Sequence, residues 1–520
     1  MLLPQPHRAT TAPRRTSWLR LGSTDAEVKL RALRELKNQI IGNRTKKLFF
    51  LKLDAIAAVS SALAQAQSQA KADLLVQSAA ALGSFACGFD AGVRVVLDSG
   101  AFPNLIALLS FPNDKVVDAG ARSLRMIYQS KLAPKYDFLQ EKNMEFLLSL
   151  LNSENETVTG LGATIIIHSC ETVAEQKALC NAGVLKKLIS LLDGSPSQRD
   201  ASLESLATII RKNPDAASKL VSESGRALSS VIDLTKDRNP RTRLLACTCL
   251  IVIRNTAPCY LQDVGVKTKL VYLLLELIDD PGQVGEEASF AFSSLIAQKE
   301  DLHKLAFEAN AIDKLYNHLQ KYLLQPRRFQ GILLALADLC FKLESCRSRF
   351  LSLEVLNLVT DALTHEVDDV RTAACICLRS VSRSIKSLSA GRFMKEMILI
   401  PLVRLLHDHS TSVQVAALGA ISNIVVDFTT TKSTFLQCGD NTCKEGILLE
   451  LTASSLSSLI CDPEHFVQEQ ALALVRNLVD GCINSVEYVF TEDGIILDAI
   501  GRQLQSASKA EIGIQVRSLL

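Results

Sequence analysis

The residues of this chain that could ligate a metal or carry out catalysis are spread along the sequence rather than grouped. The densest cluster is the triplet His407, Asp408 and His409, in which two imidazoles flank a carboxylate. These are zinc-ligand types, but a zinc site needs several such groups around one ion, and the residues next to the triplet supply only Ser and Thr. We therefore expect a solvated loop here and no metal site.

Loops that bind phosphates or cofactors are not predicted either. Gly160 and Gly162 form a Gly-x-Gly pair, but they lie inside a helical pattern, whereas a dinucleotide-binding loop follows a strand. The sequence contains no Gly-Lys-Ser/Thr loop of the phosphate-cradling kind. Because no paired titratable groups converge in the pattern, we expect no catalytic residue, no cofactor and no enzymatic activity.

Composition narrows the class of protein further. The 57 basic and 55 acidic residues nearly cancel, so the sequence predicts no concentrated basic face and no nucleic-acid partner. The 14 cysteines include no Cys-x-x-Cys pair, and Cys247, Cys249, Cys375 and Cys377 lie in apolar helical stretches. This usage predicts reduced core cysteines of an intracellular protein.

The apolar runs are too short for a membrane span. The run over 269–278 is about half of the ~20 residues that a spanning helix requires, so we expect no membrane association. The first 22 residues carry four arginines, no acidic residue and three prolines. We expect a disordered basic tail over 1–22, with a targeting segment as the alternative.

A repeat of about 42 residues organises the rest of the chain. In each copy a turn residue precedes an apolar helix that ends in paired leucines, as in 99–114 and 182–196. Gly and Asn suit these turns because they tolerate the left-handed conformation that separates two helices sharply. The predicted turn residues are spaced by 40 to 46 residues, with one double step at the end: Asp54, Gly100, Asn143, Gly183, Gly225, Gly265, Asn310, Glu354 and Gly439.

A longer helix rich in Ala and Gly follows each turn phrase, for instance over 116–128 and 412–428. Apolar residues recur every three or four positions, which is the amphipathic helical pattern. One such unit cannot bury its apolar face alone, so neighbouring units must stack. The sequence resembles the armadillo family, which implies an all-α, right-handed superhelix of about ten repeats. HEAT repeats, whose turn is weaker, are the alternative.

Armadillo import adaptors bind basic peptides through a Trp and, four residues later, an Asn on the third helix of most repeats. The Asn positions of this chain are Phe85, Met126, Ile167, Thr208, Val252, Ser294, Asp338, Ser380, Asn423 and Asn477. Only the last two are Asn, and the Trp position is never Trp, for instance at Gly419 and Ala473. The chain therefore lacks the import-adaptor ladder.

The C-terminal end of the array is the candidate partner-binding region. Ser380, Asn423 and Asn477 would line a concave groove there, and the alternative is that the two asparagines cap neighbouring turns. Two basic clusters, Arg44–Lys46–Lys47 and Arg379–Arg383, are either partner surfaces or ordinary solvated helix ends.

Three segments resemble a particular armadillo family more closely: 28–52, 378–388 and 421–439. They are similar to the armadillo repeat-containing protein 8 family, the armadillo subunit of the GID/CTLH ubiquitin ligase, in a plant-like version. The resemblance implies a non-catalytic subunit in the nucleus and cytoplasm. It would join the LisH/CTLH/SPRY core, meet RING subunits through that core, and dock a substrate receptor in its C-terminal groove for proteasomal degradation of targets.

Two departures from this family pattern concern the C-terminal part. After Gly439 a new unit begins almost at once, so we expect that about one repeat is excised. The segment 510–520 reads as the start of a further helix without a capping repeat. We thus expect repeats over 23–439 and further repeats over 440–520 with a truncated end. The alternative function is a general armadillo adaptor that binds a peptide of a transport or cytoskeletal partner.

Overall fold

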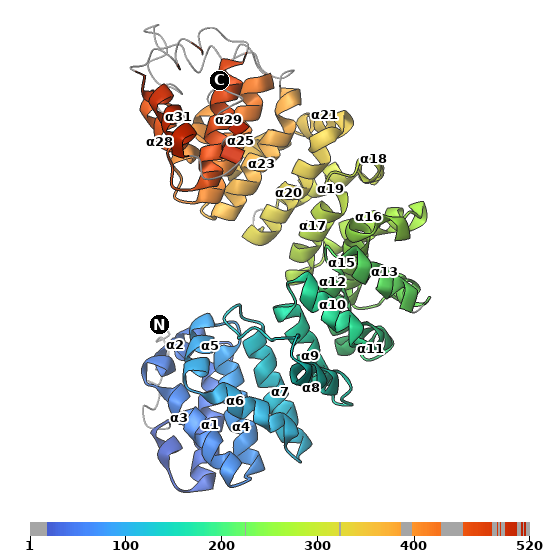
Figure 1. Cartoon of the computed structure of the whole chain (residues 1–520), viewed down its shortest axis with the longest axis vertical. Helices are drawn as coiled ribbons and strands as arrows, with labels where there is room; N and C mark the ends of the chain where they lie inside the picture. The colour runs from blue at the N-terminus through green and yellow to red at the C-terminus, as the bar shows by residue number, and fades with distance from the viewer. Residues whose placement is uncertain are drawn as a thin grey trace, which may run out of the picture. The chain divides into compact units, whose positions relative to one another are not determined.

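The computed structural model describes residues 18–223, 225–321, 324–385, 398–427, 451–480 and 494–506, with residues 486, 489, 511–512 and 514–515. These residues form helices joined by turns, and none of them lies in a strand (Figure 1). The all-α prediction is confirmed for this part of the chain.

The chain divides into two compact units, Met1–Leu261 and Gln262–Leu520. Unit 1 contains η1 (Trp18–Gly22), α1 (Ala26–Ile40), α2 (Arg44–Lys52), α3 (Ala55–Ser68), α4 (Ala72–Ala86), α5 (Asp90–Asp98), α6 (Ala101–Ala107), η2 (Leu108–Ser110), α7 (Asp114–Tyr128), α8 (Glu141–Leu151), α9 (Glu156–Ser169), α10 (Val173–Asn181), α11 (Val184–Leu191), α12 (Pro196–Ile210), α13 (Pro214–Glu223), α14 (Ala227–Leu234), α15 (Pro240–Thr256) and η3 (Pro258–Tyr260). Unit 2 contains α16 (Val264–Leu277), α17 (Gln283–Ile296), α18 (Glu300–Glu308), α19 (Ala311–Leu319), α20 (Pro326–Lys342), α21 (Glu344–Ser352), α22 (Val355–Ala362), α23 (Asp368–Ile385), α24 (Ile400–Arg404), η5 (Leu405–His407), α25 (Thr411–Asp427), α28 (Ala453–Ile460), α29 (His465–Val479) and α31 (Ile495–Ser506).

Five of the predicted turn residues adopt the left-handed conformation. Each stands between a short first helix and the second helix of its repeat, with φ between 55° and 77°. Some of them carry a Cβ atom, which is sterically unfavourable in this conformation, so the turn must require it. The five are Asp54, Gly100, Gly183, Asn310 and Glu354.

Three predicted turn residues are wrong. Asn143 and Gly265 lie within the first turns of α8 and α16, and neither has a positive φ. An irregular link precedes α8, and the three-residue helix η3 with a short loop precedes α16, so neither helix follows a short α-helix and a sharp left-handed turn. Gly225, between α13 and α14, also has no positive φ. Gly439 lies outside the described residues.

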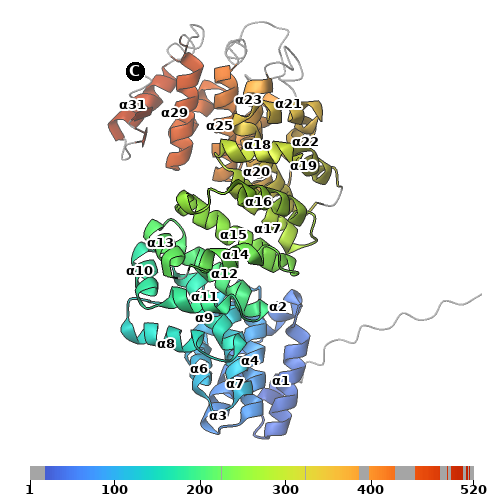
Figure 2. The ribbon, with the colours of Figure 1, turned by 90° about the vertical axis from the view of Figure 1, so that its right-hand side faces the viewer.

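The third helices of successive repeats pack directly on one another. In unit 1 the series is α1, α4, α7, α9, α12 and α15, and in unit 2 it is α17, α20, α23, α25 and α29 (Figure 2). Small residues permit this close approach: a Cβ on Gly83 would lie 2.9 Å from the Cα of Ser123, and one on Gly331 would lie 2.8 Å from the Cβ of Ser289. Stacking therefore builds one continuous core within each unit.

The four cysteines singled out in the sequence belong to these cores. Cys247, Cys249, Cys375 and Cys377 are all fully buried. Burial raises the pKa of Cys249 and of Cys375 to about 12, because a thiolate is poorly solvated in an apolar environment. The thiols of Cys249 and Cys375 are therefore protonated at neutral pH.

The last five residues of the predicted N-terminal tail are helical. Residues 18–22 form η1, which packs on α1 and α3, and Leu21 is buried there. Residues 1–17 and the predicted boundary at 439/440 lie outside the described residues. On the C-terminal side of that boundary, α29 packs directly on α25, so the stack of third helices is continuous across it.

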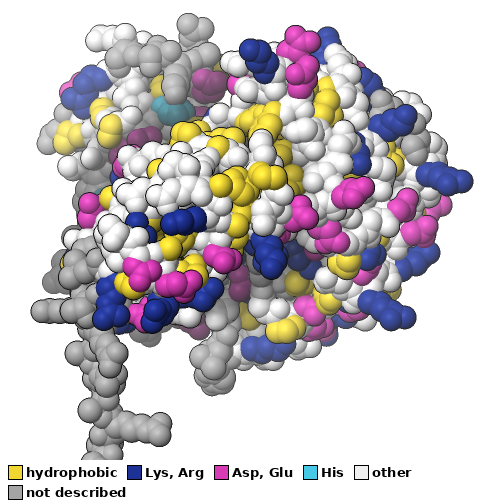
Figure 3. Space-filling model, turned by 90° about the horizontal axis from the view of Figure 1, so that it is seen from below, with side chains coloured by type: hydrophobic (Ala, Val, Ile, Leu, Met, Phe, Trp, Pro, Cys, Tyr) yellow, Lys and Arg dark blue, Asp and Glu magenta, His cyan; other side chains and the backbone are white. Residues whose placement is uncertain are grey.

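Charges of both signs share the surface. On the face drawn in Figure 3, Lys and Arg side chains interleave with Asp and Glu side chains around exposed hydrophobic ones. In the part of the chain that the structure describes, no single helix is long and apolar enough to cross a membrane, although two bent helix pairs, 44–68 and 90–110, pass by length and composition alone.

Candidate partner-binding site

The three predicted partner-binding residues lie on successive third helices of unit 2. Ser380 is on α23, Asn423 on α25 and Asn477 on α29. Because α23 packs on α25 and α25 on α29, the three positions follow one another across neighbouring helices. All three side chains are half-buried, so each combines a solvent-facing side with a packed one.

Ser380 contributes little to contacts between repeats. Its hydroxyl donates a hydrogen bond of 3.2 Å to the carbonyl oxygen of Ile376, one turn earlier on the same helix. This is the ordinary local bond of a serine inside a helix, and it leaves the hydroxyl oxygen able to accept a bond from a partner.

The two asparagines tie each repeat to the one before it. The amide of Asn477 donates to the hydroxyl of Ser422 on α25 at 2.6 Å, and the amide of Asn423 donates to the carbonyl of Arg379 on α23 at 3.5 Å. Both residues stand inside helices and neither caps a neighbouring turn, so the capping alternative is wrong. The bond of Asn423 is at the limit of hydrogen-bond length, so it is a weak one.

Arginines beside these positions were only partly anticipated by the sequence. Arg379 reaches over Gly419, where an added Cβ would lie 3.1 Å from its Nη1 atom and 3.6 Å from Oε1 of Gln470. Gly419 is one of the positions where an import adaptor carries Trp. In this chain the guanidinium of Arg379, from the preceding helix, lies where the indole ring of that Trp would be. The basic pair 379–383 was the only sequence signal for this arrangement.

A second arginine lies on the last third helix. Arg476 Nη1 donates to Oε1 of Gln515 at 2.9 Å, and its Nε and Nη2 atoms lie 3.4 and 3.5 Å from Oδ1 of Asn477. We call Arg379, Ser380, Asn423, Gln470 and Asn477 the C-terminal face. Its amides and guanidinium offer donors and acceptors suited to a peptide backbone or a carboxylate.

In unit 1, two of the predicted Asn positions line hollows in the surface. Met126 lines a cavity of about 610 Å³, and Ile167 lines one of about 880 Å³. Phe85 does not fit the pattern, because its side chain is fully buried and the neighbouring Ser84 lines the first cavity instead. The register of the predicted position is therefore one residue off in α4.

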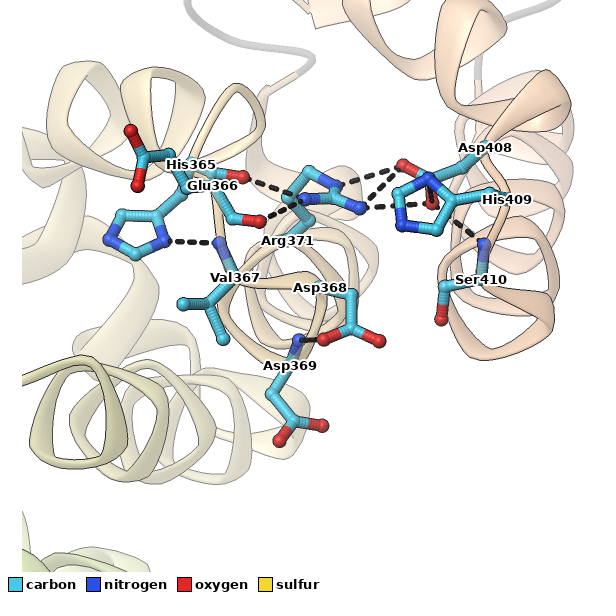
Figure 4. A network of polar contacts seen from close by, with 9 residues as sticks. All are labelled: His365, Glu366, Val367, Asp368, Asp369, Arg371, Asp408, His409 and Ser410. Carbon is cyan, nitrogen blue, oxygen red and sulfur yellow. Dashed lines mark hydrogen bonds and ion pairs between the residues drawn. The ribbon is translucent and has the colours of Figure 1, made fainter. Parts of the chain in front are cut away.

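The predicted solvated loop at the His407–His409 triplet holds a buried ion pair. Both oxygens of Asp408 accept bonds of 2.9 Å from Nε and Nη2 of Arg371 on α23, and both side chains are 8% exposed (Figure 4). The two histidines are solvated as expected: both are exposed, His409 with 86% of its side chain. The pair links residues 37 positions apart, which a local pattern cannot reveal.

Further bonds complete this network. Nη1 of Arg371 donates to the carbonyl oxygens of His365 and Glu366, and the backbone N–H of Ser410 donates to Asp408 (Figure 4). Burial by itself would raise the pKa of Asp408, but the bonds from Arg371 and Ser410, with the charges of Arg371 and His409, lower it overall. Asp408 is therefore ionised at neutral pH and engaged by Arg371. In the described residues, no three His, Cys, Asp or Glu side chains are grouped so that they could hold a metal ion.

Comparisons with known proteins agree with this architecture. The family model for the Armadillo/beta-catenin-like repeat matches residues 395–426, which include α24 and α25. This match favours armadillo over HEAT repeats. A solved structure titled "A conserved phosphorylation switch controls the interaction between cadherin and beta-catenin in vitro and in vivo" covers 97% of this chain and 99% of its own, at 14% identity and a TM-score of 0.47.

Curated relatives cover most of the sequence. Armadillo repeat-containing protein 8 of Mus musculus is 24% identical over 563 residues, covering 96% of this chain and 82% of the relative. GID complex subunit 5 of Schizosaccharomyces pombe is 23% identical over 363 residues, covering 57% of this chain and 46% of the relative. The chain is therefore an armadillo-repeat protein that is homologous, over 96% of its length, to armadillo repeat-containing protein 8.

Proposed function

We propose that this chain is a non-catalytic scaffold subunit of a GID/CTLH-type ubiquitin ligase. It joins the LisH/CTLH/SPRY core, contacts RING subunits through that core, and docks a substrate receptor whose targets go to proteasomal degradation. The observation that carries the proposal is the similarity along nearly the whole chain to armadillo repeat-containing protein 8, together with the match to a GID complex subunit.

The C-terminal face is the proposed receptor-docking region. Ser380, Asn423 and Asn477 present hydroxyl and amide groups on three neighbouring helices, which is the chemistry that holds an extended peptide by its backbone. Arg379 adds a positive charge that favours a carboxylate at the end of such a peptide. A scaffold role needs only binding groups of this kind, and no proton-transfer or nucleophilic pair.

Affinity purification of the tagged chain from cells, with mass spectrometry of the co-purifying proteins, tests the proposal. We expect LisH/CTLH and RING subunits from the wild-type chain, and a receptor in addition. The double variant Asn423→Ala/Asn477→Ala should keep the core subunits but lose most of the receptor. Recovery of no ligase subunit with soluble, folded chain would reject the scaffold role.

A general adaptor that binds a linear peptide is the second candidate function. The cavities along the third helices of unit 1 favour it, because they offer binding surface that needs no ligase. Tight binding of a free peptide by the purified chain, without co-purifying ligase subunits, would support this candidate. We further propose that the chain occurs in both the cytoplasm and the nucleus, which cell fractionation would test.

A further inference from the structure

The cavity of about 610 Å³ in unit 1 has the features of a ligand site. It lies over α4 and α7, with residues from α1 and α2 at its rim. We call it the N-terminal cavity. Its lining residues run from Val76 on α4 to Cys87, which directly follows that helix, and from Lys115 to Met126 on α7. Each side contributes about 16 Å of length at 1.5 Å per residue. An extended segment of about five residues fits that length.

Small and apolar residues make the floor of this cavity. Val76, Ala80 and Ser84 follow one another at intervals of one turn on α4, and Met126 faces them from α7. Gly83 lets the two helices approach until Ser123 bonds the carbonyl of Ala79 at 2.7 Å. The hollow is therefore a consequence of short side chains on tightly packed helices, and its floor suits an apolar side chain.

The charged residues of the cavity are strongly unbalanced. Lys37, Lys47, Lys115 and Arg122 line it against the single carboxylate of Asp118. Asp118 is already paired with Arg122 at 2.9 Å. The lysines are not neutralised within the cavity: Lys37 donates to the neutral side-chain oxygen of Gln77 at 3.0 Å. The remaining positive charge calls for an anionic ligand.

Lys47 is the strongest part of this argument. Its side chain is 6% exposed, and its ammonium donates to the backbone carbonyl of Cys87 at 2.6 Å. An ammonium has three donors, and in the described part of the chain no carboxylate lies within ion-pair distance of this one. Burial lowers the pKa of Lys47, because the loss of hydration disfavours the ammonium more than the nearby Cys87 thiol favours it.

The neighbouring cavity of about 880 Å³ does not have this imbalance. Four basic residues there face the carboxylates of Glu171, Asp200 and Glu204. Several of these charges already pair with one another, such as Lys135 with Glu171 at 2.5 Å. Of the two cavities, the N-terminal cavity is therefore the better site for an anionic ligand.

We propose that the N-terminal cavity binds a short acidic peptide segment of a partner protein. One apolar side chain of the segment rests on Val76, Ala80 and Met126, while its carboxylates pair with Lys47 and Lys37. Of the basic cluster 44–47, Lys47 belongs to the proposed site. The guanidinium carbon of Arg44 instead lies 5.9 Å from the centre of the Phe89 ring. The proposal does not depend on the ligase assignment.

Fluorescence anisotropy with the full chain tests it, using a labelled peptide of alternating Glu and Leu, six residues long, and a matched Lys/Leu peptide. We expect the Glu/Leu peptide to bind, the Lys/Leu peptide not to bind, and the affinity to fall as salt is raised. Lys47→Met keeps the apolar stem and removes the charge, and should weaken binding about tenfold or more. Lys46→Met, on the same helix outside the cavity, is the control and should leave binding unchanged.

A second variant keeps the test decisive if Lys47→Met fails to fold. Ala80→Phe fills the cavity floor and leaves every lysine in place, and it should also abolish binding of the Glu/Leu peptide. Equal affinity for the two peptides, or unchanged affinity in folded Lys47→Met or folded Ala80→Phe, would overturn the proposal. Co-purification of ligase subunits is scored separately, so the two proposals fail independently.

Discussion

The N-terminal cavity and the C-terminal face are built at the same place in the repeat, on consecutive third helices, yet they differ in what covers their floor. Over α4 and α7 the floor is left open, and Lys37 and Lys47 stand around it without carboxylate partners. On the C-terminal face Arg379 already covers Gly419, and Asn477 is bonded to the preceding helix.

We propose that this difference suits the same position of the repeat to two kinds of recognition. An open apolar floor with unbalanced charge suits a ligand that buries an apolar side chain and neutralises a cation. Such a site discriminates between ligands by their residue types. On a face of amides and a guanidinium, a ligand would replace existing hydrogen bonds with its own. Such a site discriminates between ligands by the positions of their donors and acceptors. Equivalent helices of different repeats would therefore suit partners of different chemistry.

The largest effect on the stability of unit 2 is expected at the buried ion pair between Arg371 and Asp408. Asp408→Asn leaves the buried guanidinium of Arg371 without its counter-charge, and we expect a loss of about 3–5 kcal/mol in the free energy of unfolding. Urea denaturation of the purified chain would measure it. Asp233→Asn removes an exposed pair with Lys236 and should cost less than about 1 kcal/mol. An equally small effect at Asp408 would show that the pair does not stabilise unit 2.

The same pair predicts a pH dependence. Because the folded state lowers the pKa of Asp408, its contribution to stability is complete above about pH 5 and is lost as the pH falls through the lowered pKa. Melting temperatures measured from pH 7 to pH 3 should fall more steeply for the wild-type chain than for Asp408→Asn. Parallel curves would contradict the assignment.

One substitution type should act with opposite sign in the two regions. A Cβ on Gly83 would lie 2.9 Å from the Cα of Ser123, a backbone atom that cannot move alone, so Gly83→Ala should destabilise by about 1–3 kcal/mol. A Cβ on Gly419 meets the mobile end of Arg379 at 3.1 Å, so Gly419→Ala should be neutral or stabilise by up to about 1 kcal/mol. Thermal unfolding of both variants compares them directly, and the same sign for both would refute this view of the packing.

The smallest effects are expected at the two asparagines. Asn477→Ala removes a 2.6 Å bond to Ser422 and should cost about 1 kcal/mol, whereas Asn423→Ala removes a marginal 3.5 Å bond and should change stability by less than about 0.5 kcal/mol. Chemical denaturation would rank them. If Asn423→Ala proved the more damaging, its amide would be structural and not available to a ligand.

Much of the fold could be predicted because its signals are local. The left-handed turns at Asp54 and Glu354 were identified from spacing alone, although neither residue is Gly or Asn. The same spacing was misleading at Asn143 and Gly265, because no short α-helix with a left-handed turn precedes α8 or α16. Periodicity locates a second helix, but it does not say what precedes that helix.

The candidate sites depended on contacts between repeats. Arg371 and Asp408 are 37 residues apart, and Lys47 and Cys87 are 40 apart, so neither contact follows from a pattern within one repeat. The sequence by itself determined the helices, most of the turns and the positions that third helices present, because caps, left-handed turns and amphipathic spacing act over a few residues. Only the tertiary structure decided which of those positions stay open to solvent. The reason is that a long side chain of one repeat can lie over the short side chains of the next repeat and cover them.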